Sequence, residues 1–353
     1  MPEYAHGGDI YSYQEKYGRV PIDFSSNINP LGLQKAVLAA LCEAAIHADR
    51  YPDARCTRLI QTLAEFEQIP QDWILCGNGA ADLIYRTVYA RRPKRALLLS
   101  PTFSEYEAAL RAVKCRVQFY RLKEETGFVL TPDFLKELDC GYDMIFLCNP
   151  NNPTGRTIAP ALLREITARC AQVGARLVVD ECFLDFVPGG ETLVPYLDEF
   201  PSLVLLRAYT KMYAVPGVRF GWCMTADTAL IEGLYRAGQP WNVSVIAQAC
   251  AAACAQESAF AHESATRIAD ERAYLSAQLV ARGLWVCPGE ANFLLFRAQD
   301  VDLQEKLARR GILVRDCSNY RGLARGYYRT AVKMRKESDA LLAALDEIQK
   351  EES

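Results

Sequence analysis

From Pro70 to Gly221 the sequence repeats one unit: a short apolar run, then a turn rich in Gly, Pro and Asn, then a helical pattern. This order predicts a parallel β-sheet with helices between its strands. Several runs are apolar throughout, as expected of strands covered on both faces. The runs are Trp73 to Leu75, Ala96 to Leu99, Met144 to Leu147, Arg176 to Val179 and Leu203 to Leu206. Ligands of such sheets bind at the carboxyl ends of the strands, which is where a site is expected.

The segments on either side of this block have other patterns. An extended arm precedes a helix over Leu33 to His47, and helices are predicted over Ser244 to Ala255 and Ala259 to Arg282. A shorter strand-and-helix region follows from Trp285. We therefore predict an α/β protein with a mostly parallel sheet flanked by helices and a smaller α+β domain. The expected divisions are an N-terminal arm (1–32), a large domain (49–239) and a small domain (33–48 with 240–353).

Composition narrows the class of protein. The 353 residues are 50% hydrophobic and 24% charged, which is typical of a globular chain. A net charge of −3 gives no basic footprint for nucleic acid. We find no apolar stretch of transmembrane length and no signal-peptide pattern at the start, so we predict a cytoplasmic protein without a membrane partner. The thirteen cysteines are scattered and the histidines number three, so reduced thiols and no metal site are expected.

The most informative residue is Lys211, because the apolar run Leu203 to Leu206 leads this amine into a turn rich in Gly and Pro. A second cation, Arg219, follows eight residues later. A partly desolvated lysine near another cation can lose its proton at neutral pH and attack a carbonyl carbon. Arg219 could meanwhile hold a phosphate. Taken alone, a loop lysine is more often a solvated surface charge.

Other strand ends carry complementary groups. The run from Cys76 to Asp82 contains small residues before a helix, which suits an anion at the helix N-terminus or a simple tight turn. Asp180 ends a strand and could pair with a protonated ring nitrogen, cap a helix or form an ion pair. The prolines of Phe146 to Gly155 set Asn152 in a tight turn, and Phe103 offers an aromatic face. A planar, anionic cofactor with a ring nitrogen and an aldehyde would use all of these groups.

With these motifs the chain resembles the fold-type I pyridoxal-phosphate enzymes of the class I/II aminotransferase superfamily over nearly its whole length. It is most similar to the L-threonine-O-3-phosphate decarboxylases of cobalamin biosynthesis, and histidinol-phosphate aminotransferases are near relatives. The local matches are His6 to Gly8, Asp23 to Gly32, Arg50 to Ala54, Asp180 to Phe186 and Tyr327 to Ala331.

The resemblance implies roles for individual residues. Lys211 would carry the cofactor and then act as acid and base, and Asp180 would keep the ring nitrogen protonated. Tyr51 would reach the cofactor phosphate from a second subunit, so a homodimer with shared sites is implied. The implied cofactor-binding residues are Tyr51, Ala80, Ala81, Phe103, Asn152, Asp180, Phe183, Thr210, Lys211 and Arg219.

For the substrate, the resemblance implies that Arg329 binds the carboxylate with its planar guanidinium. A substrate phosphate needs further donors, and His6 and Lys333 are the candidates. The alternatives are a terminal histidine without a role and a solvated lysine. Asn27 and Asn152 complete the predicted substrate site.

The reaction itself is less well defined by motifs, because decarboxylation and transamination use the same groups. Phe183 stands where aminotransferases usually carry a tyrosine, which favours decarboxylation of threonine phosphate to (R)-1-aminopropan-2-yl phosphate. Ala208 and Lys333 depart from the expected pattern, and Lys333 leaves O-phosphoserine as a competing substrate. The alternatives are a histidinol-phosphate type aminotransferase and a catalytically idle ligand sensor.

Overall fold

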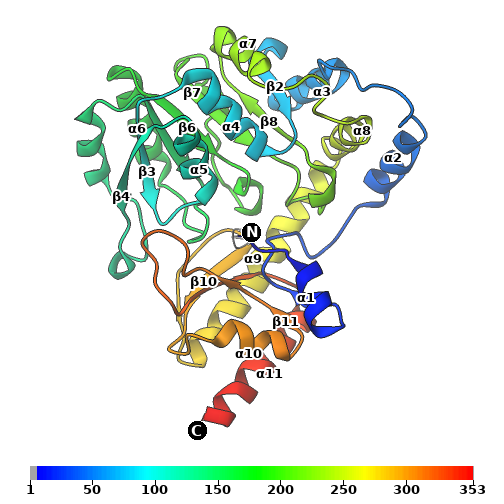
Figure 1. Ribbon diagram of the computed structural model, residues 1–353, viewed down its shortest axis with the longest axis vertical. Coiled ribbons are helices and arrows are strands. Elements are labelled where there is room, and N and C mark those ends of the chain that lie inside the picture. Colours follow the sequence, from blue (N-terminus) through cyan, green and yellow to red (C-terminus); the bar gives the residue numbers. More distant parts are fainter. Residues whose placement is uncertain (1–5, 353) are drawn as a thin grey trace.

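A seven-stranded sheet forms the centre of the computed structural model, which describes residues 6–352 apart from the side chains of Cys140 and Glu352 (Figure 1). The first five residues of the predicted arm lie outside this range. The strand order is β2-β8-β7-β6-β5-β3-β4, and only β8 runs antiparallel to its neighbours. The strands are β2 (Ile74–Gly77), β3 (Arg95–Ser100), β4 (Arg116–Arg121), β5 (Met144–Cys148), β6 (Arg176–Asp180), β7 (Leu203–Arg207) and β8 (Gly221–Met224).

All five predicted strands are therefore present, and the predicted fold class is confirmed. Two further strands, β4 and β8, were not predicted. The edge strand β4 alternates between exposed and partly buried residues, so it lacks the continuous apolar run of an interior strand. The four residues of β8 directly follow the turn after Lys211, which hides them within a longer motif.

Helices cover both faces of this sheet because successive strand residues point to opposite sides. On one face Leu97, Ile145 and Val179 share a buried cluster with helices that include α3, α6 and α8. On the other, Leu98 and Val178 pack against helices that include α4, α5 and α7. These helices are α3 (Thr57–Glu67), α4 (Ala80–Arg91), α5 (Ser104–Ala112), α6 (Pro160–Gln172), α7 (Thr228–Arg236) and α8 (Val245–Cys254).

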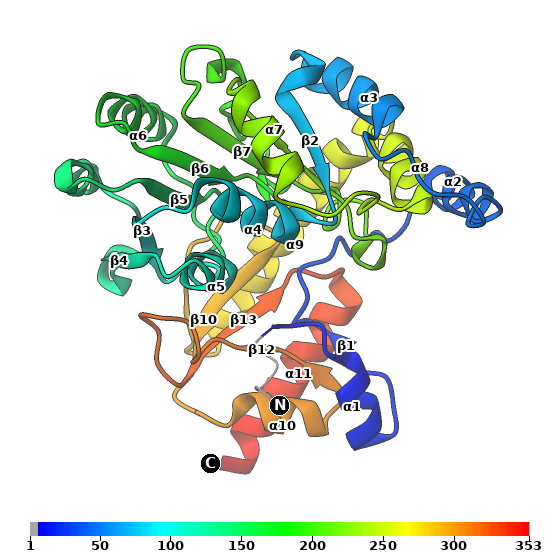
Figure 2. The same ribbon diagram turned by 45° about the horizontal axis from the view of Figure 1, so that its top comes forward.

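A second, four-stranded antiparallel sheet has the order β12-β13-β10-β9 and lies below the first in Figures 1 and 2. The long helix α9 passes between the two parts, since its Ile268 belongs to the cluster of the large sheet and its Leu275 to that of the small sheet. The elements here are α9 (Ser258–Ala281), β9 (Trp285–Val286), β10 (Phe293–Arg297), α10 (Leu303–Arg309), β12 (Arg315–Asp316), β13 (Tyr327–Ala331) and α11 (Arg335–Glu352).

The N-terminal arm is not wholly extended, contrary to the prediction. It contains helix α1 (Ile10–Tyr17), in which the Asp9 side chain caps the helix by accepting from Ser12 N at 3.1 Å. The helix is held to α10 by Tyr13, whose hydroxyl donates to the Ala308 carbonyl at 2.6 Å. The following strand β1 (Ile22–Asp23) pairs in parallel with β11 (Ile312–Leu313). The arm thus packs on the small sheet and its helices.

Helix α2 (Lys35–Ala45) lies beside α8, and both predicted helices are present. Their buried Val37 and Ala247 share the cluster of the large sheet. The predicted divisions at residues 33, 49 and 240 stay a prediction. No helix within residues 6–352 is long and apolar enough to cross a membrane.

Candidate functional site

The carboxyl ends of β5, β6 and β7 bring the principal predicted residues to one edge of the sheet. Asp180 is the last residue of β6 and pairs with Cys148 of β5 and Leu206 of β7. Asn152 lies four residues beyond β5, and Lys211 lies four beyond β7. The parallel strands therefore place a carboxylate, an amide and an amine around one location.

Lys211 is held in place through its backbone, because its carbonyl accepts from Asn29 N of the arm at 3.0 Å. Burial lowers the pKa of its side chain to about 8, and the positive charges of Arg219 and Arg329 act in the same direction. Cys182 and Asp180 oppose that shift. The amine is therefore neutral far more often near physiological pH than that of an exposed lysine, and the neutral form is the one that acts as a nucleophile.

Asp180 is 5% exposed and has two local donors. Its Oδ2 accepts from the Tyr106 hydroxyl at 2.7 Å, and its Oδ1 accepts from Cys182 N at 3.0 Å. The Tyr106 ring stacks on Phe146 with centroids 5.1 Å apart and meets the edge of Phe103 at 5.6 Å. Burial, together with the charge of Asp180, raises the pKa of Tyr106 well above its usual range, so this phenol remains a donor. The sequence reasoning missed Tyr106.

The turn between β2 and α4 forms a close backbone cradle. A Cβ on Gly79 would lie 2.7 Å from Arg219 Nη2, and one on Gly221 would lie 2.6 Å from Ala80 N. The Arg219 guanidinium therefore packs directly against the turn that precedes the helix. Thr210 is buried close by and its hydroxyl donates to the Phe220 carbonyl at 3.3 Å. Helix N–H groups beside a guanidinium are a donor set that fits a phosphate.

Asn152 and Arg329 contact each other across the two sheets. Arg329 Nη1 donates to Asn152 Oδ1 at 2.6 Å, and its Nη2 donates to the Ser25 carbonyl at 2.8 Å. Because Oδ1 faces the guanidinium, Asn152 Nδ2 is the atom left to donate to a ligand. Arg329 Nε is buried and has no partner among the described residues. A buried guanidinium with a spare donor suits an anionic ligand.

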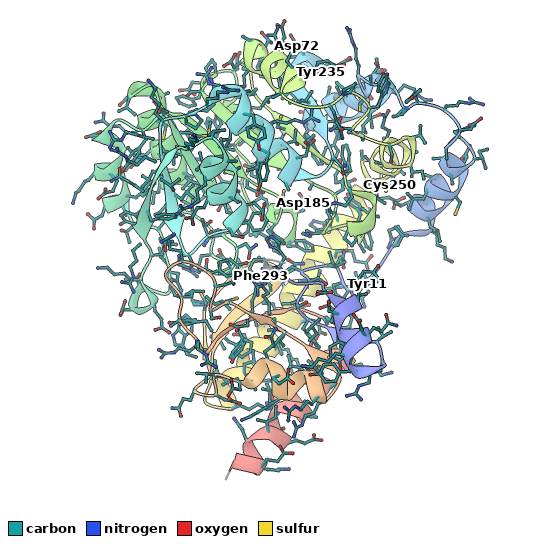
Figure 3. The ribbon with its side chains drawn as sticks, in the orientation of Figure 1. Tyr11, Asp72, Asp185, Tyr235, Cys250 and Phe293 are labelled. Carbon is teal, nitrogen blue, oxygen red and sulfur yellow. The ribbon has the colours of Figure 1, made fainter. Side chains whose placement is uncertain are left out.

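The two predicted aromatic contacts occupy different environments. Phe103 is partly exposed beside Tyr106, where a planar ring could stack on it. Phe183 is buried and meets the Phe293 ring edge-on, with centroids 5.0 Å apart. Figure 3 places Phe293 where the small sheet faces the large one. Phe183 thus joins the two sheets through an apolar contact.

The remaining predicted substrate-binding residues are His6, Asn27 and Lys333, and each has different surroundings. His6 Nε2 is 2.8 Å from Glu105 Oε1, and its ring centroid is 5.9 Å from that of Phe103. Asn27 is buried, and its Oδ1 has no partner within residues 6–352. The Lys333 amine lies 5.9 Å from the centre of the Phe24 ring. His6 therefore lies near Phe103, the residue predicted to stack on the cofactor, whereas Lys333 lies near Phe24 of the arm.

A second arginine, Arg315, was missed in the sequence. It is directly opposite Arg329 in the pairing of β12 with β13, so both side chains lie on one face of the small sheet. Its Nη2 donates to Asn319 Oδ1 at 2.8 Å, and its guanidinium is 5.7 Å from the Tyr320 ring centre. The Tyr320 hydroxyl reaches Asn152 Oδ1 at 3.3 Å. Arg315 thus adds a largely buried positive charge close to Arg329.

Tyr51 lies on the surface of its own chain, 80% exposed. Its ring packs on Trp241 with centroids 4.8 Å apart. Its ring contact is therefore with the segment before α8.

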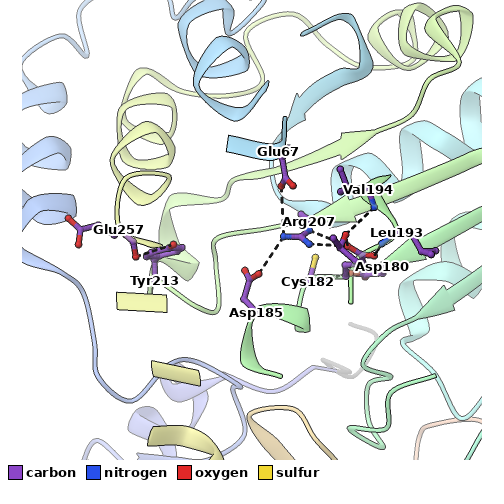
Figure 4. Close-up of polar contacts among 11 residues, drawn as sticks. Glu67, Asp180, Cys182, Asp185, Leu193, Val194, Arg207, Tyr213 and Glu257 are labelled. Carbon is purple, nitrogen blue, oxygen red and sulfur yellow. Dashed lines mark hydrogen bonds and ion pairs between the residues drawn. The ribbon is translucent and has the colours of Figure 1, made fainter. Parts of the chain in front are cut away.

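A buried ion network supports the strand ends from behind (Figure 4). Arg207, at the end of β7, donates to Glu181 Oε2 from Nε at 3.2 Å and from Nη2 at 3.1 Å. It also approaches Asp185 at 3.4 Å and Glu67 at 3.8 Å. Burial alone would lower the pKa of Arg207, but the three carboxylates together raise it. The network fixes the end of β6, which carries Asp180, against the end of β7.

The chain belongs to the class I and II aminotransferase family, whose sequence model matches residues 19–345. It is 38% identical to the threonine-phosphate decarboxylase of Salmonella typhimurium, over 97% of this chain and 95% of that protein. It is 30% identical to the histidinol-phosphate aminotransferase of Bdellovibrio bacteriovorus, over 99% of this chain and 96% of that protein. The crystal structure of the histidinol-phosphate aminotransferase from Clostridium acetobutylicum matches with a TM-score of 0.87 and 27% identity, over 93% and 99% of the two chains. These matches confirm the family resemblance.

Proposed function

We propose that this protein is a pyridoxal 5'-phosphate-dependent decarboxylase that converts L-threonine O-3-phosphate into (R)-1-aminopropan-2-yl phosphate, for the side chain of cobalamin. The observation that carries the proposal is the full-length similarity to a threonine-phosphate decarboxylase, combined with a site that has the required groups. These are a buried lysine with a lowered pKa, a carboxylate at the neighbouring strand end and two arginines on the small sheet.

The described residues fit this cofactor. When bound, pyridoxal phosphate supplies a ring that accepts electrons as the bond to the substrate carboxylate breaks. The turn before α4 and Arg219 would hold its phosphate, and Asn152 Nδ2 would donate to its ring oxygen. Asp180 would pair with the ring nitrogen, and Tyr106 and Cys182 N orient that carboxylate.

The amine of Lys211 has a second task after it first holds the cofactor. Because its pKa of about 8 is close to neutral pH, the amine can both accept a proton and return one to the substrate carbon from which CO2 has left. Phe183 and Phe293 exclude water from the side of the site between the two sheets.

For the substrate, Arg329 would bind the carboxylate and Arg315 the phosphate. The carboxylate and the phosphate together carry about two and a half to three negative charges, which calls for both guanidinium groups. His6 is a further phosphate donor, carried by the arm near Phe103. Asn27 and Lys333 remain candidates from the sequence. O-phosphoserine would use the same donors and lacks one methyl group.

The active form is a homodimer in this proposal, because Tyr51, which would bind a cofactor phosphate, is 80% exposed on its own chain. Trp241 beside it is also exposed, and so are Leu38 of α2 and Ile46 at the end of that helix. Such a surface is typical of an interface. Tyr51 of one subunit would then donate to the cofactor phosphate in the other. A cytoplasmic location is part of the same proposal.

Transamination is the second candidate, favoured by the 30% identity with histidinol-phosphate aminotransferases over nearly the whole chain. Phe183 argues for decarboxylation, since its ring packs on Phe293 and offers no hydroxyl to the ring oxygen. A ligand sensor would bind the cofactor and substrate without turnover.

The deciding experiment incubates cofactor-loaded protein with O-phosphothreonine or O-phosphoserine without a keto acid, and measures CO2 and the phosphoamine. Both products should form in equal amounts, and a Lys211→Ala variant should lose the visible absorbance of the lysine-bound cofactor and the activity. Amino transfer from histidinol phosphate to a keto acid, without CO2, would instead support the aminotransferase. Binding without either product would support the sensor.

A further inference from the structure

One carboxylate joins the phosphate-binding turn to the surface that carries Tyr51. Asp82, in the first turn of α4, accepts from Asn78 N at 3.0 Å through Oδ2. The same Oδ2 accepts from Asn242 Nδ2 at 2.8 Å. Asp82 Oδ1 is held by Arg86 Nε at 2.9 Å, so the carboxylate is fixed on both sides. Asn242 is therefore attached to the back of the turn that would hold the cofactor phosphate.

Asn242 also fixes its neighbour Trp241 in an unusual conformation. Trp241 has φ +57°, a left-handed backbone that a bulky residue adopts only where the surrounding contacts enforce it. The segment directly after Trp241 is held by the hydrogen bond from Asn242 to Asp82 and by the buried side chain of Val243. The indole itself is 48% exposed and packs on Tyr51 at 4.8 Å. The support for the Tyr51 ring thus begins at Asn242.

We propose that Asn242 is a positioning residue for the cofactor site of the other subunit. By holding Trp241 against Tyr51, it sets where the Tyr51 hydroxyl meets the cofactor phosphate bound across the interface. This inference rests on the proposed function, because it requires both the cofactor and the dimer. The competing local role is that Asn242 only orients Asp82 and the turn of its own subunit.

The first test measures the affinity of the cofactor-free protein for pyridoxal phosphate by titrating the visible absorbance of the lysine-bound form. Asn242→Ala removes one hydrogen bond to a carboxylate, so we expect affinity to fall about tenfold. Tyr51→Phe should weaken binding by a similar factor. If Asn242 acts through Tyr51, the double variant should bind no more weakly than Tyr51→Phe alone. Effects that multiply would overturn the proposal.

A matched control removes a hydrogen bond to an aspartate far from this surface. The Tyr274 hydroxyl donates to Asp339 Oδ1 at 2.7 Å near α11, and Tyr274→Phe should leave the affinity unchanged. Sedimentation checks that every variant is dimeric at the concentrations used.

Mixed dimers locate the effect in one subunit or the other. A subunit with Lys211→Ala gives no lysine-bound absorbance, so the signal reports only the site of its partner. Pairing Lys211→Ala/Asn242→Ala with wild type leaves a site that receives Tyr51 from the altered subunit, and its affinity should fall about tenfold. Pairing Lys211→Ala with Asn242→Ala leaves a site that receives Tyr51 from an intact subunit, and its affinity should stay at the wild-type value. The reverse pattern would establish the local role.

Trp241→Leu provides a second variant if Asn242→Ala does not fold. It removes the ring that supports Tyr51 and keeps the bond to Asp82, so the same mixed-dimer pattern is expected. An unchanged affinity in both mixed dimers would overturn the proposal. If the wild-type protein is monomeric or gives no lysine-bound absorbance, the failure lies in the proposed function instead.

Discussion

The buried amine of Lys211 should make the cofactor-free protein less stable at neutral pH than a protein with a neutral side chain there. Its pKa falls from the usual 10.5 to about 8, chiefly because of burial. That difference corresponds to about 3 kcal/mol of unfolding free energy at pH 7, where the folded protein must hold the charged form. Lys211→Met keeps much of the volume and removes this cost.

The unfolding free energy of the wild-type protein should increase with pH. The unfolded chain keeps the Lys211 proton up to about pH 10.5, whereas the folded chain releases it near pH 8. Between these values the unfolded state binds more protons, so wild-type stability rises with pH. The advantage of Lys211→Met should therefore be about 3 kcal/mol at pH 7 and below about 1 kcal/mol at pH 10.

Urea unfolding of the two cofactor-free proteins at pH 7 and pH 10, at equal protein concentration, measures this difference. Lys136→Met is the control, because Lys136 is exposed and its hydrogen bond with Asp133 raises its pKa. Losing that side chain should not stabilise the protein at pH 7. An advantage of Lys211→Met that is equal at both pH values would refute the reasoning, since packing rather than charge would then explain it.

Three further predictions concern individual contacts. Tyr106→Phe removes a buried donor to Asp180 and should weaken cofactor binding about tenfold in an absorbance titration; an unchanged affinity would contradict the assigned role. Arg329→Lys loses the forked guanidinium and should raise the substrate KM more than about tenfold with little change in cofactor affinity, which initial-rate kinetics would test. Peptide mass spectrometry should show rapid alkylation of Cys42, which is exposed. Cys182 should be alkylated more slowly, because burial and Asp180 raise its pKa. Cofactor loading should protect only Cys182, and equal labelling with and without cofactor would place that thiol outside the site.

The sequence predicts residues whose positions follow from local strand patterns. Asp180, Asn152 and Lys211 lie at the ends of continuously apolar runs, and parallel strands place such ends at one edge. The edge strand β4 could also have been found, because charged or polar and apolar side chains alternate from Arg116 to Phe119. Likewise, Asp9 is a helix-capping residue that indicates the helix in the arm.

Contacts between segments that are far apart in the sequence do not follow from such local patterns. Tyr106 meets Asp180 only because helix α5, which carries it, packs on the sheet that contains β6, and the two residues are 74 positions apart. Arg315 becomes a candidate only through its register with Arg329 in the small sheet. Neither relation has a periodic signature along the chain, so a pattern search within short windows misses both residues.

The path of the arm has a consequence for the order in which the protein is assembled. Strand β1 leaves the ribosome long before its partner β11 and before Arg329, which donates to the Ser25 carbonyl. At about 5–20 residues per second, the arm must wait roughly 15 to 60 seconds for these partners. The strands of the large sheet are all made earlier, whereas the proposed substrate site is complete only after β12 and β13 have been made. A chain that stops before α10 would lack Ala308, β11 and Arg329, so a segment made late determines whether the arm docks.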